Sequence, residues 1–360
     1  MNKFFCFALD FSYLCSRLGQ KTMGSLSSMD RTSLSKRLDP SSILGGSTLA
    51  KGEFNVLSPL RYESGRAERK SCSQRSRFKA PFTNIPLSSI NYQLLNIMLG
   101  AIIGDIVGSR FEFDEKPTEG FELFTEDCDF TDDTICTVAI ADAILNERPY
   151  KETLVEWCQR YPNPKGGYGN MFLHWLGERN HLPQASFGNG SAMRVSPVGW
   201  LFNDYEELQR QAKQSAEVSH CHQEGIRGAQ CIATVIYWLR TCRLTKDEIE
   251  GAVARNFQYQ LPPLRDIFRI GSNGHFDSTC QETVPWALRC FLDAEDFEGT
   301  LRNAIMAQGD TDTKGAIACS VAEACYEIPD AIADRALEFL PVDMLTIVEQ
   351  FYDRVQQNIE

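Results

Sequence analysis

The spacing of apolar residues is the feature that most restricts the fold of this chain. From residue 98 onward, apolar side chains recur at every third or fourth position in one segment after another, which is the period of one helix face. No segment shows the strict alternation that a half-buried β-strand needs. Residues 98–360 are therefore predicted to form an all-α domain. The expected helices cover residues 98–107, 131–145, 154–161, 171–176, 192–202, 205–218, 225–239, 246–257, 284–292, 297–306, 313–326, 332–339 and 344–355. The loops between them are short except at 110–130, 162–170, 181–191 and 259–282.

Charge and cysteine content exclude several classes of protein. The 360 residues carry a formal net charge of −12 and no basic stripe beside aromatic residues, which argues against a nucleic-acid-binding protein. No apolar run reaches the roughly 18 residues of a membrane-spanning helix, so no membrane span is expected. The 13 cysteines include no C-x-x-C pair, which favours reduced thiols and a reducing compartment over disulfides or a zinc site. Cys136, Cys231, Cys319 and Cys325 fall within helical patterns and are expected to be buried as small hydrophobic residues.

Residues 1–97 differ from the rest of the chain in charge and pattern. They hold 14 Lys and Arg against 6 Asp and Glu, whereas residues 98–360 hold 22 against 42. The segment is rich in Ser and lacks sustained periodicity, so we expect a basic extension of low order. Its acid-poor Ser/Arg composition also fits an organelle transit peptide, whereas Asp10 interrupts the apolar start that a secretion signal would need. The expected location is cytoplasmic, with organelle targeting through this extension as the alternative.

Two short acidic stretches lie far apart in the sequence. Thr131-Asp132-Asp133-Thr134 and Asp310-Thr311-Asp312-Thr313 each stand directly before an apolar helical run, so each places carboxylates and hydroxyls at a helix N-terminus. Helix capping alone would explain one such cluster, because Thr and Asp are favoured at the N-cap and in the first turn. Two clusters in one chain favour a shared metal site, since converging carboxylates repel one another unless a cation lies between them. Ligands that are all oxygen select Mg²⁺ or Mn²⁺ over Zn²⁺.

Glycine and histidine positions add two further hypotheses. Ser186-Phe187-Gly188-Asn189-Gly190-Ser191 is a glycine-rich turn whose backbone N–H groups suit a diphosphate, with Phe187 as a face for an adenine or a ribose. An ordinary loop with an N-cap is the competing interpretation. Gly104 and Gly108 are four residues apart, so they share a helix face that permits close helix packing. His220 and His222 have no partner at zinc-ligand spacing, so zinc is not expected.

The order of these motifs resembles that of the ADP-ribosylglycohydrolase family over essentially all of residues 98–360. The motifs are Gly100-Ala101-Ile102-Ile103-Gly104-Asp105 through Glu112, Phe130-Thr131-Asp132-Asp133-Thr134, Gly167-Tyr168-Gly169, the Ser186 to Arg194 segment, Ser219-His220, and Gly309-Asp310-Thr311-Asp312-Thr313. The likeness is greatest to short bacterial-type members that begin near the equivalent of Met98. The resemblance implies a compact multi-helix orthogonal bundle and a binuclear centre of two Mg²⁺ ions, with Mn²⁺ as the alternative.

The resemblance also implies roles for individual residues. Metal ligation falls to Thr131, Asp132, Asp133, Asp310, Asp312 and Thr313, and catalysis to Glu112, Asp132, Asp133, Asp310 and Asp312. Substrate binding falls to Gly167, Tyr168, Gly169, Ser186, Phe187, Gly188, Asn189, Gly190, Ser191 and His220. Glu112 matches a family glutamate on a loop that orients the attacking water or closes over the site. Lys314, where relatives often have small or apolar residues, is expected to point to solvent.

These expectations describe a metal-dependent hydrolase that cleaves the glycosidic bond at C1″ of ADP-ribose, linked to a protein side chain or a small-molecule acceptor. Two alternatives stay open: an ADP-ribose-binding or structural family member without turnover, and a di-metal hydrolase of another nucleotide-like substrate. The acceptor linkage and the identity of the general acid or base also stay open, although 113–129 and 259–282 are expected to face the acceptor. The expected partner is the ADP-ribose substrate, with no nucleic acid and no membrane, and the expected oligomeric state is a monomer.

Overall fold

Helices make up the part of the chain that the structure, a computed structural model, describes: residues 97–113 and 116–359. No β-strand occurs among these residues, and two isolated β-bridges join Gln184 to His220 and Gly188 to Thr279. The predicted all-α class is therefore confirmed. The helices are α2 (Leu99–Gly108), α3 (Asp132–Leu145), α4 (Tyr150–Arg160), α5 (Asn170–Gly177), α6 (Gly190–Met193), α7 (Ser196–Leu201), α8 (Tyr205–Glu217), α9 (Gln223–Tyr237), the π-helical turn η3 (Trp238–Cys242), α10 (Lys246–Phe257), α11 (Leu264–Ser272), α12 (Cys280–Leu292), α13 (Phe297–Met306), α14 (Thr311–Ala322), α15 (Asp330–Leu337) and α16 (Val342–Ile359). The predicted extension at 1–97 lies outside the described residues apart from Ile97.

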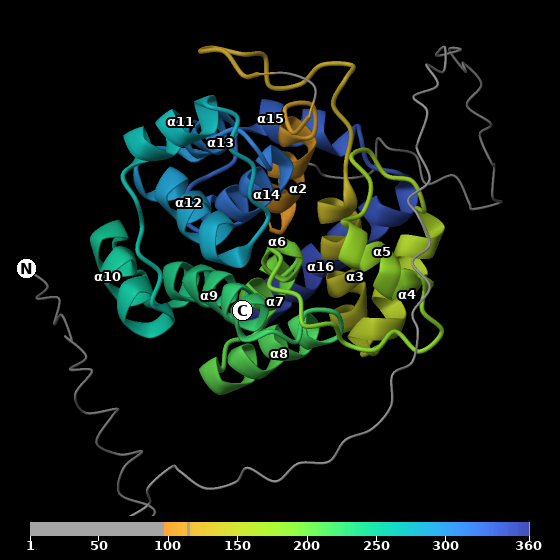
Figure 1. Cartoon of the computed structure of the whole chain (residues 1–360). Helices are drawn as coiled ribbons and strands as arrows, with labels where there is room; N and C mark the ends of the chain where they lie inside the picture. The colour runs from red at the N-terminus through yellow and green to blue at the C-terminus, as the bar shows by residue number, and fades with distance from the viewer. Residues whose placement is uncertain (1–96, 114–115, 360) are drawn as a thin grey trace, which may run out of the picture. The chain divides into compact units, whose positions relative to one another are not determined.

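Helices α2 and α14 pack side by side in the middle of the bundle, with α12 and α13 next to them (Figure 1). A Cβ on Gly104 of α2 would lie 2.1 Å from the carbonyl oxygen of Gly315, and one on Gly315 would lie 2.3 Å from that of Gly104. Gly108 lies against α14 in the same way, since a Cβ added to it would lie 2.5 Å from the Cα of Asp312. The predicted close packing along the glycine face of α2 is thus confirmed. The two helices run antiparallel, so the last turn of α2 meets the first turn of α14.

The start of α2 is held by a glutamate side chain from the far end of α14. Met98, which precedes the helix, has a positive φ of 70° and provides no side-chain cap. Instead, the backbone N–H groups of Met98 and Gly100 and the indole N–H of Trp200 all donate to the buried carboxyl group of Glu323. These bonds satisfy donors that the first turn of a helix otherwise leaves without partners.

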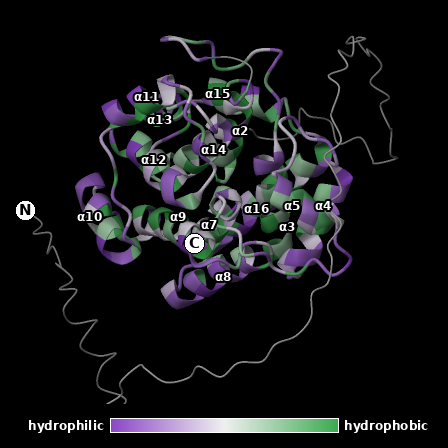
Figure 2. Cartoon of the chain, viewed as in Figure 1, coloured by the Kyte–Doolittle hydropathy of each residue, from purple (hydrophilic) through white to green (hydrophobic). Residues whose placement is uncertain are grey.

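Outer helices follow the amphipathic pattern that the sequence predicts. In α8, the buried residues Leu208, Ala212, Ser215 and Ala216 lie three to four positions apart and face the core, while the remaining face is polar. Figure 2 shows this polar surface along α8 and α10, the helices at the periphery of the bundle. None of the described helices has both the length and the apolar character to cross a membrane.

Three details differ from the sequence-based expectation. Helix α11 lies within 259–282, which was predicted to be a loop; Leu264, Ile267 and Phe268 do follow the helical spacing, but the helix is only nine residues long. The single helix expected at 192–202 is two short helices, α6 and α7, and Pro197 lies in the first turn of α7, where a missing N–H costs nothing. Cys325 lies beyond the end of α14 and is exposed, so its predicted burial is wrong, whereas Cys136, Cys231 and Cys319 are buried.

Candidate active site

The N-terminus of α3 is positioned by a buried aspartate on α2. Asp105 is fully buried, and its carboxylate accepts hydrogen bonds from the backbone N–H and hydroxyl of Thr131, at 2.9 and 2.7 Å, and from the same two groups of Thr134. Burial raises the pKa of Asp105 to about 6, and these hydrogen bonds oppose the rise. Thr131 is the N-cap of α3 and accepts from the backbone N–H of Asp133. The capping interpretation is correct for Thr131, and the first-turn carboxylates of Asp132 and Asp133 are left for other partners.

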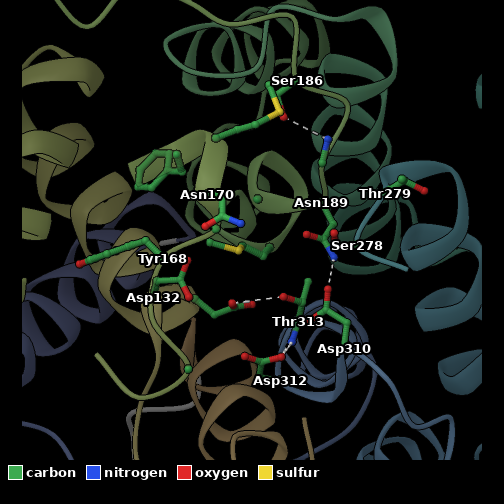
Figure 3. A pocket seen from close by; sticks show the side chains of 18 of the residues that line it. Asp132, Tyr168, Asn170, Ser186, Asn189, Ser278, Thr279, Asp310, Asp312 and Thr313 are labelled. Atoms are coloured by element: carbon green, nitrogen blue, oxygen red, sulfur yellow. Dashed lines mark hydrogen bonds between the residues drawn. The ribbon is translucent and has the colours of Figure 1, made fainter. Parts of the chain in front are cut away.

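The N-terminus of α14 presents its carboxylates differently. Asp310 occupies the N-cap position, yet its side chain makes no capping hydrogen bond. Its Oδ2 instead accepts from the side-chain amide of Asn189, 2.7 Å away, so this carboxylate is turned out of its own helix (Figure 3). The hydroxyl of Thr311 donates to the carbonyl oxygen of Gly108 and ties α14 to the end of α2. Simple capping therefore does not account for Asp310.

The two helix N-termini meet. The hydroxyl of Thr313 on α14 donates to Oδ2 of Asp133 on α3 at 3.2 Å, and Figure 3 shows Asp132, Asp310, Asp312 and Thr313 around one space. Glu112, on the turn after α2, completes the group: one carboxylate oxygen each from Glu112, Asp310 and Asp312 lie within 4.8 Å of one another. Helix starts that are remote in sequence thus share one acidic cluster, as the sequence predicted.

Burial and mutual repulsion oppose ionisation in this cluster. Burial, then the charge of Asp310, raises the pKa of Glu112 to about 8. Burial, with neighbouring carboxylates second, also raises the pKa of Asp132, Asp133 and Asp312 well above the ordinary value. Oδ1 of Asp133 is buried and has no hydrogen-bond partner among the described residues. A cation placed among these oxygens would satisfy that atom and favour the ionised carboxylates, and the all-oxygen donor set fits Mg²⁺ or Mn²⁺.

A cavity of about 580 Å³ opens beside the acidic cluster, a volume suited to a small-molecule ligand. One wall is the glycine-rich loop 186–190, which is pinned to the start of α12 by hydrogen bonds from the Asn189 N–H to the Ser278 carbonyl and from the Cys280 N–H to the Phe187 carbonyl. The Gly188 N–H is also engaged, with the hydroxyl of Ser186. Two of the loop amides predicted to bind a diphosphate are therefore already paired within the protein.

His220 lies behind this loop and lines the same cavity. A Cβ on Gly190 would lie 3.2 Å from the His220 ring, so a glycine at this position gives the imidazole access to the loop. Burial, then the charge of Arg194, lowers the pKa of His220 to about 3. The imidazole is therefore neutral throughout the physiological pH range.

Aromatic side chains surround the mouth of the cavity. Phe113 and Phe276 stack with their ring centroids 5.8 Å apart and an interplanar angle of 18°, and both are exposed. Phe113 directly follows Glu112, and the backbone of Phe276 packs against Gly309, the residue before Asp310. This pair flanks the acidic cluster. Phe187 lies against the imidazole of His222 at the glycine-rich loop. The cavity thus has an acidic part flanked by a phenyl pair and a second part lined by the loop.

Comparison with known families matches residues 89–359 to the ADP-ribosylglycohydrolase family. The chain belongs to this family. Mouse ADP-ribosylhydrolase ARH3 is 22% identical over 326 residues, covering 69% of this chain and 88% of the relative. The ADP-ribosyl-[dinitrogen reductase] glycohydrolase of Rhodospirillum rubrum is 21% identical over 267 residues, covering 67% and 88%. A solved structure described as an ADP-ribosylglycohydrolase-related protein complex matches with a TM-score of 0.55 and 22% identity, covering 73% of this chain and 98% of that one, which shows the shared fold.

Membership confirms the resemblance seen in the sequence and makes this family member a glycohydrolase. The structure also brings most of the residues named for the site to the lining of one cavity. These are Glu112, Asp132, Asp133, Gly167, Tyr168, Gly169, Ser186, Phe187, Gly188, Asn189, Gly190, His220, Asp310, Asp312 and Thr313. Thr131 and Ser191 do not line it: the Thr131 hydroxyl donates to Asp105, and the Ser191 hydroxyl donates to the carbonyl oxygen of Gly225. Their predicted roles in metal and substrate binding stay predictions.

One expectation about this region is wrong. Lys314 does not point to solvent; its side chain is 1% exposed, lies 5.2 Å from the Trp286 ring centre and donates to the carbonyl oxygen of Gln308. Gln308 and Gly309 both have positive φ, of 56° and 71°, so Lys314 supports the tight turn that delivers Asp310. The local sequence does not distinguish an inward-pointing lysine near a helix N-terminus from one that points to solvent.

Sequence reasoning missed several residues of the site. Asp105 was part of the first motif, but no role was assigned to it. A carboxylate in an otherwise apolar helix was a signal that it accepts hydrogen bonds inside the protein. Arg194 and Ser219 also line the cavity, and both stood in quoted motifs. Phe113 and Phe276 carry no motif, but they fall in the two segments expected to face the acceptor.

Proposed function

We propose that this protein hydrolyses the glycosidic bond at C1″ of ADP-ribose in a reaction that depends on Mg²⁺ or Mn²⁺. The observation that carries the proposal is the convergence of the α3 and α14 N-termini, with the Thr313 hydroxyl 3.2 Å from Asp133 and Glu112 beside Asp310 and Asp312. The acidic cluster lies next to a cavity with a glycine-rich wall in a member of this family, which supports a nucleotide-like substrate. The relatives named above are described as ADP-ribosyl hydrolases, which supports ADP-ribose in particular.

Asp132, Asp133, Asp310, Asp312 and Thr313 would hold the cations. When bound, these ions neutralise the repulsion between the carboxylates, orient ribose hydroxyls and lower the pKa of a water molecule. The chain itself fixes the geometry: Asn189 orients Asp310, and Thr313 orients Asp133. Glu112 sits on a turn rather than on a helix and is partly exposed, so it is the carboxylate placed to contact water or substrate at the anomeric carbon. The carboxylates also favour the positive charge that develops in glycoside cleavage.

The rest of the substrate would extend from the acidic cluster along the glycine-rich loop. Phe187, which is 46% exposed, offers a face for the adenine or a ribose, and His220 lies under the loop where the diphosphate would pass. The hydroxyl of Tyr168 donates to the carbonyl oxygen of Tyr161, so Tyr168 presents its ring rather than its hydroxyl to the cavity. The exposed Phe113 and Phe276 would face the acceptor on the other side of the scissile bond.

A substrate panel tests this proposal. Arginine-linked and serine-linked ADP-ribosyl peptides are incubated with the protein in Mg²⁺, in Mn²⁺ and after dialysis against EDTA, and released ADP-ribose is quantified. Asp310→Ala is expected to lower turnover more than about 100-fold, since loss of groups that merely support metal ligands already costs about 10–100-fold. Asp353→Ala removes an exposed carboxylate from α16 and serves as the matched control.

The outcome separates the competing functions. Turnover by the wild type that survives in Asp310→Ala would refute the metal-centre assignment. Calorimetric binding of ADP-ribose without release from any substrate would indicate a binding protein. Mg²⁺-dependent activity on another phosphorylated substrate, without competition from ADP-ribose, would indicate a different di-metal hydrolase.

A further inference from the structure

A buried arginine contributes to the lining of the cavity. Arg194 is 0% exposed, and neither its Nε nor its Nη1 makes a hydrogen bond among the described residues. Its Nη2 donates twice, to the backbone carbonyl oxygen of Ser215 at 3.0 Å and to the hydroxyl oxygen of Ser219 at 2.8 Å. Both hydrogens of Nη2 are thereby used. A guanidinium group can only donate, so the Ser219 oxygen is an acceptor in this contact.

The Ser219 hydroxyl has one hydrogen left to donate. Its oxygen lies 2.8 Å from Nδ1 of His220, and the described residues offer it no other side-chain or backbone acceptor. If the hydroxyl accepts from Arg194 and donates to Nδ1, then Nη2 of Arg194, the Ser219 hydroxyl and Nδ1 of His220 all have partners. In this arrangement Nδ1 carries no proton. A neutral imidazole then carries its proton on Nε2. Burial and the nearby guanidinium charge, which lower the pKa of His220 to about 3, keep the ring in this neutral form.

The backbone around His220 fixes the direction in which Nε2 points. Its N–H donates to the carbonyl oxygen of Ala216 at 2.8 Å, and the residues on either side of it pair with Gln184. Nε2 lies 3.2 Å from the position of a Cβ on Gly190 and 3.6 Å from that of Gly188. It makes no hydrogen bond within the described part of the chain, and it is not among the polar atoms sealed from solvent. The Nε2–H group therefore faces the glycine-rich wall.

We propose that Arg194 and Ser219 are positioning residues that hold His220 as the neutral Nε2–H tautomer, a fixed hydrogen-bond donor to an anionic oxygen of the ligand. This proposal rests on the proposed function for the identity of the ligand, a diphosphate, but not for the relay from Arg194 through Ser219. The relay compensates for the loop amides that are already paired: with the N–H groups of Gly188 and Asn189 engaged, a donor from below the loop replaces part of the predicted amide site.

The opposite tautomer would fail on two counts. A proton on Nδ1 would be donated to Ser219, whose own hydroxyl hydrogen would then lack an acceptor in a buried place, which is unfavourable. Nε2 would present a lone pair to the ligand, which repels a phosphate oxygen. The Arg194 contact reinforces this preference, because a Ser219 oxygen that already accepts from the guanidinium group is left to donate its hydrogen to Nδ1.

Spectroscopy on the full chain tests the relay without any ligand. The protein has 5 histidines, and long-range ¹H–¹⁵N spectra of ¹⁵N-histidine-labelled protein report which ring nitrogen carries the proton; His220→Gln identifies the His220 signals by their loss. We expect a protonated Nε2 and an unprotonated Nδ1 in the wild type at neutral pH. In Ser219→Ala and Arg194→Met, we expect Nδ1–H to become populated. Wild-type protein with the proton on Nδ1, or Ser219→Ala with an unchanged tautomer, would overturn the proposal.

Binding measurements supply the second readout. The dissociation constant for ADP-ribose is expected to rise about tenfold in Ser219→Ala, the loss of one hydrogen bond to a charged group, and less in Arg194→Lys, which keeps one donor. Ser215→Ala is the matched control: it removes a buried hydroxyl that donates only to Ala212 and keeps the carbonyl that Arg194 uses. Equal affinities in Ser219→Ala and Ser215→Ala would also refute the relay. Wild-type protein that does not bind ADP-ribose would refute the proposed function instead, and the tautomer result would stand by itself.

Discussion

The contact between α2 and α14 makes Gly104→Ala the most informative single substitution for the fold. The new Cβ would lie 2.1 Å from the carbonyl carbon and oxygen of Gly315 and 2.6 Å from the N–H of Ala316. Ordinary contact begins at 3.4 Å, so the neighbouring backbone has to move by a little over 1 Å. No flexible side chain is available to give way, because each of these neighbours is backbone. The two helices must separate, and with them Asp105 and Asp312, which they carry.

The cost follows from this geometry. Forcing an extra methyl group into a packed core costs about 1–3 kcal/mol of stability. Because backbone atoms surround Gly104, we expect the cost at this site to be about 3 kcal/mol or more. At 2–4 °C for each kcal/mol in a domain of this size, the melting temperature of Gly104→Ala should fall by roughly 6–12 °C. Because the displaced ends of α2 and α14 hold the acidic cluster, we also expect weaker stabilisation by Mg²⁺.

Circular dichroism melting curves with Mg²⁺ and with EDTA measure both effects. Gly177→Ala is the control, since a Cβ on Gly177 meets no atom within 4 Å and its φ is not in the left-handed region. The control should melt roughly 1–4 °C above the wild type, because a glycine-to-alanine change at a compatible position stabilises by about 0.4–1 kcal/mol. A Gly104→Ala protein that melts together with the control would show that the α2–α14 contact is looser than this reasoning requires.

Glu323 and Lys314 supply three further predictions. Glu323→Ala leaves three buried N–H donors without an acceptor and should lower the free energy of unfolding by at least about 3 kcal/mol in urea titrations; a loss below about 1 kcal/mol would contradict the capping role. Burial raises the pKa of Glu323 from 4.5 to about 8, so the native state holds a proton that the unfolded state releases. The stability that this proton provides is complete below about pH 4.5 and is lost as pH rises toward 8. The difference in unfolding free energy between wild type and Glu323→Gln at pH 5, 7 and 9 should therefore decline as pH rises, and a flat difference would refute this. Lys314→Met removes a buried positive charge beside Asp310, which opposes a cation in the acidic cluster, so thermal shift assays should show a larger gain in melting temperature on adding Mg²⁺ than in wild type; an equal gain would count against this repulsion.

Much of the fold was predictable because the apolar spacing of a helix is visible within its own segment of sequence. The helix at 205–218 was expected from the spacing of Leu208, Ala212 and Ala216, and α8 occupies almost that range. Helix α11 was missed although Leu264, Ile267 and Phe268 show helical spacing, because its nine residues stand between Pro262-Pro263 and Asn273-Gly274, which favour a loop. The two acidic stretches were recognisable for a similar reason: their residue types and their position before apolar runs are both visible in the sequence.

The chain by itself determined most of the helical segments, which face of α2 is free of side chains, and which carboxylates stand at helix starts. Only the tertiary structure decided which of those groups meet. The Thr131 hydroxyl serves Asp105 rather than the cavity, Lys314 turns inward under Asp310, and Arg194 reaches Ser219 from a different segment. Each of these outcomes depends on how the packed helices and turns place an acceptor or exclude water. A contact between residues distant in sequence is set by the packing of whole helices, which the composition of either partner's own segment does not specify.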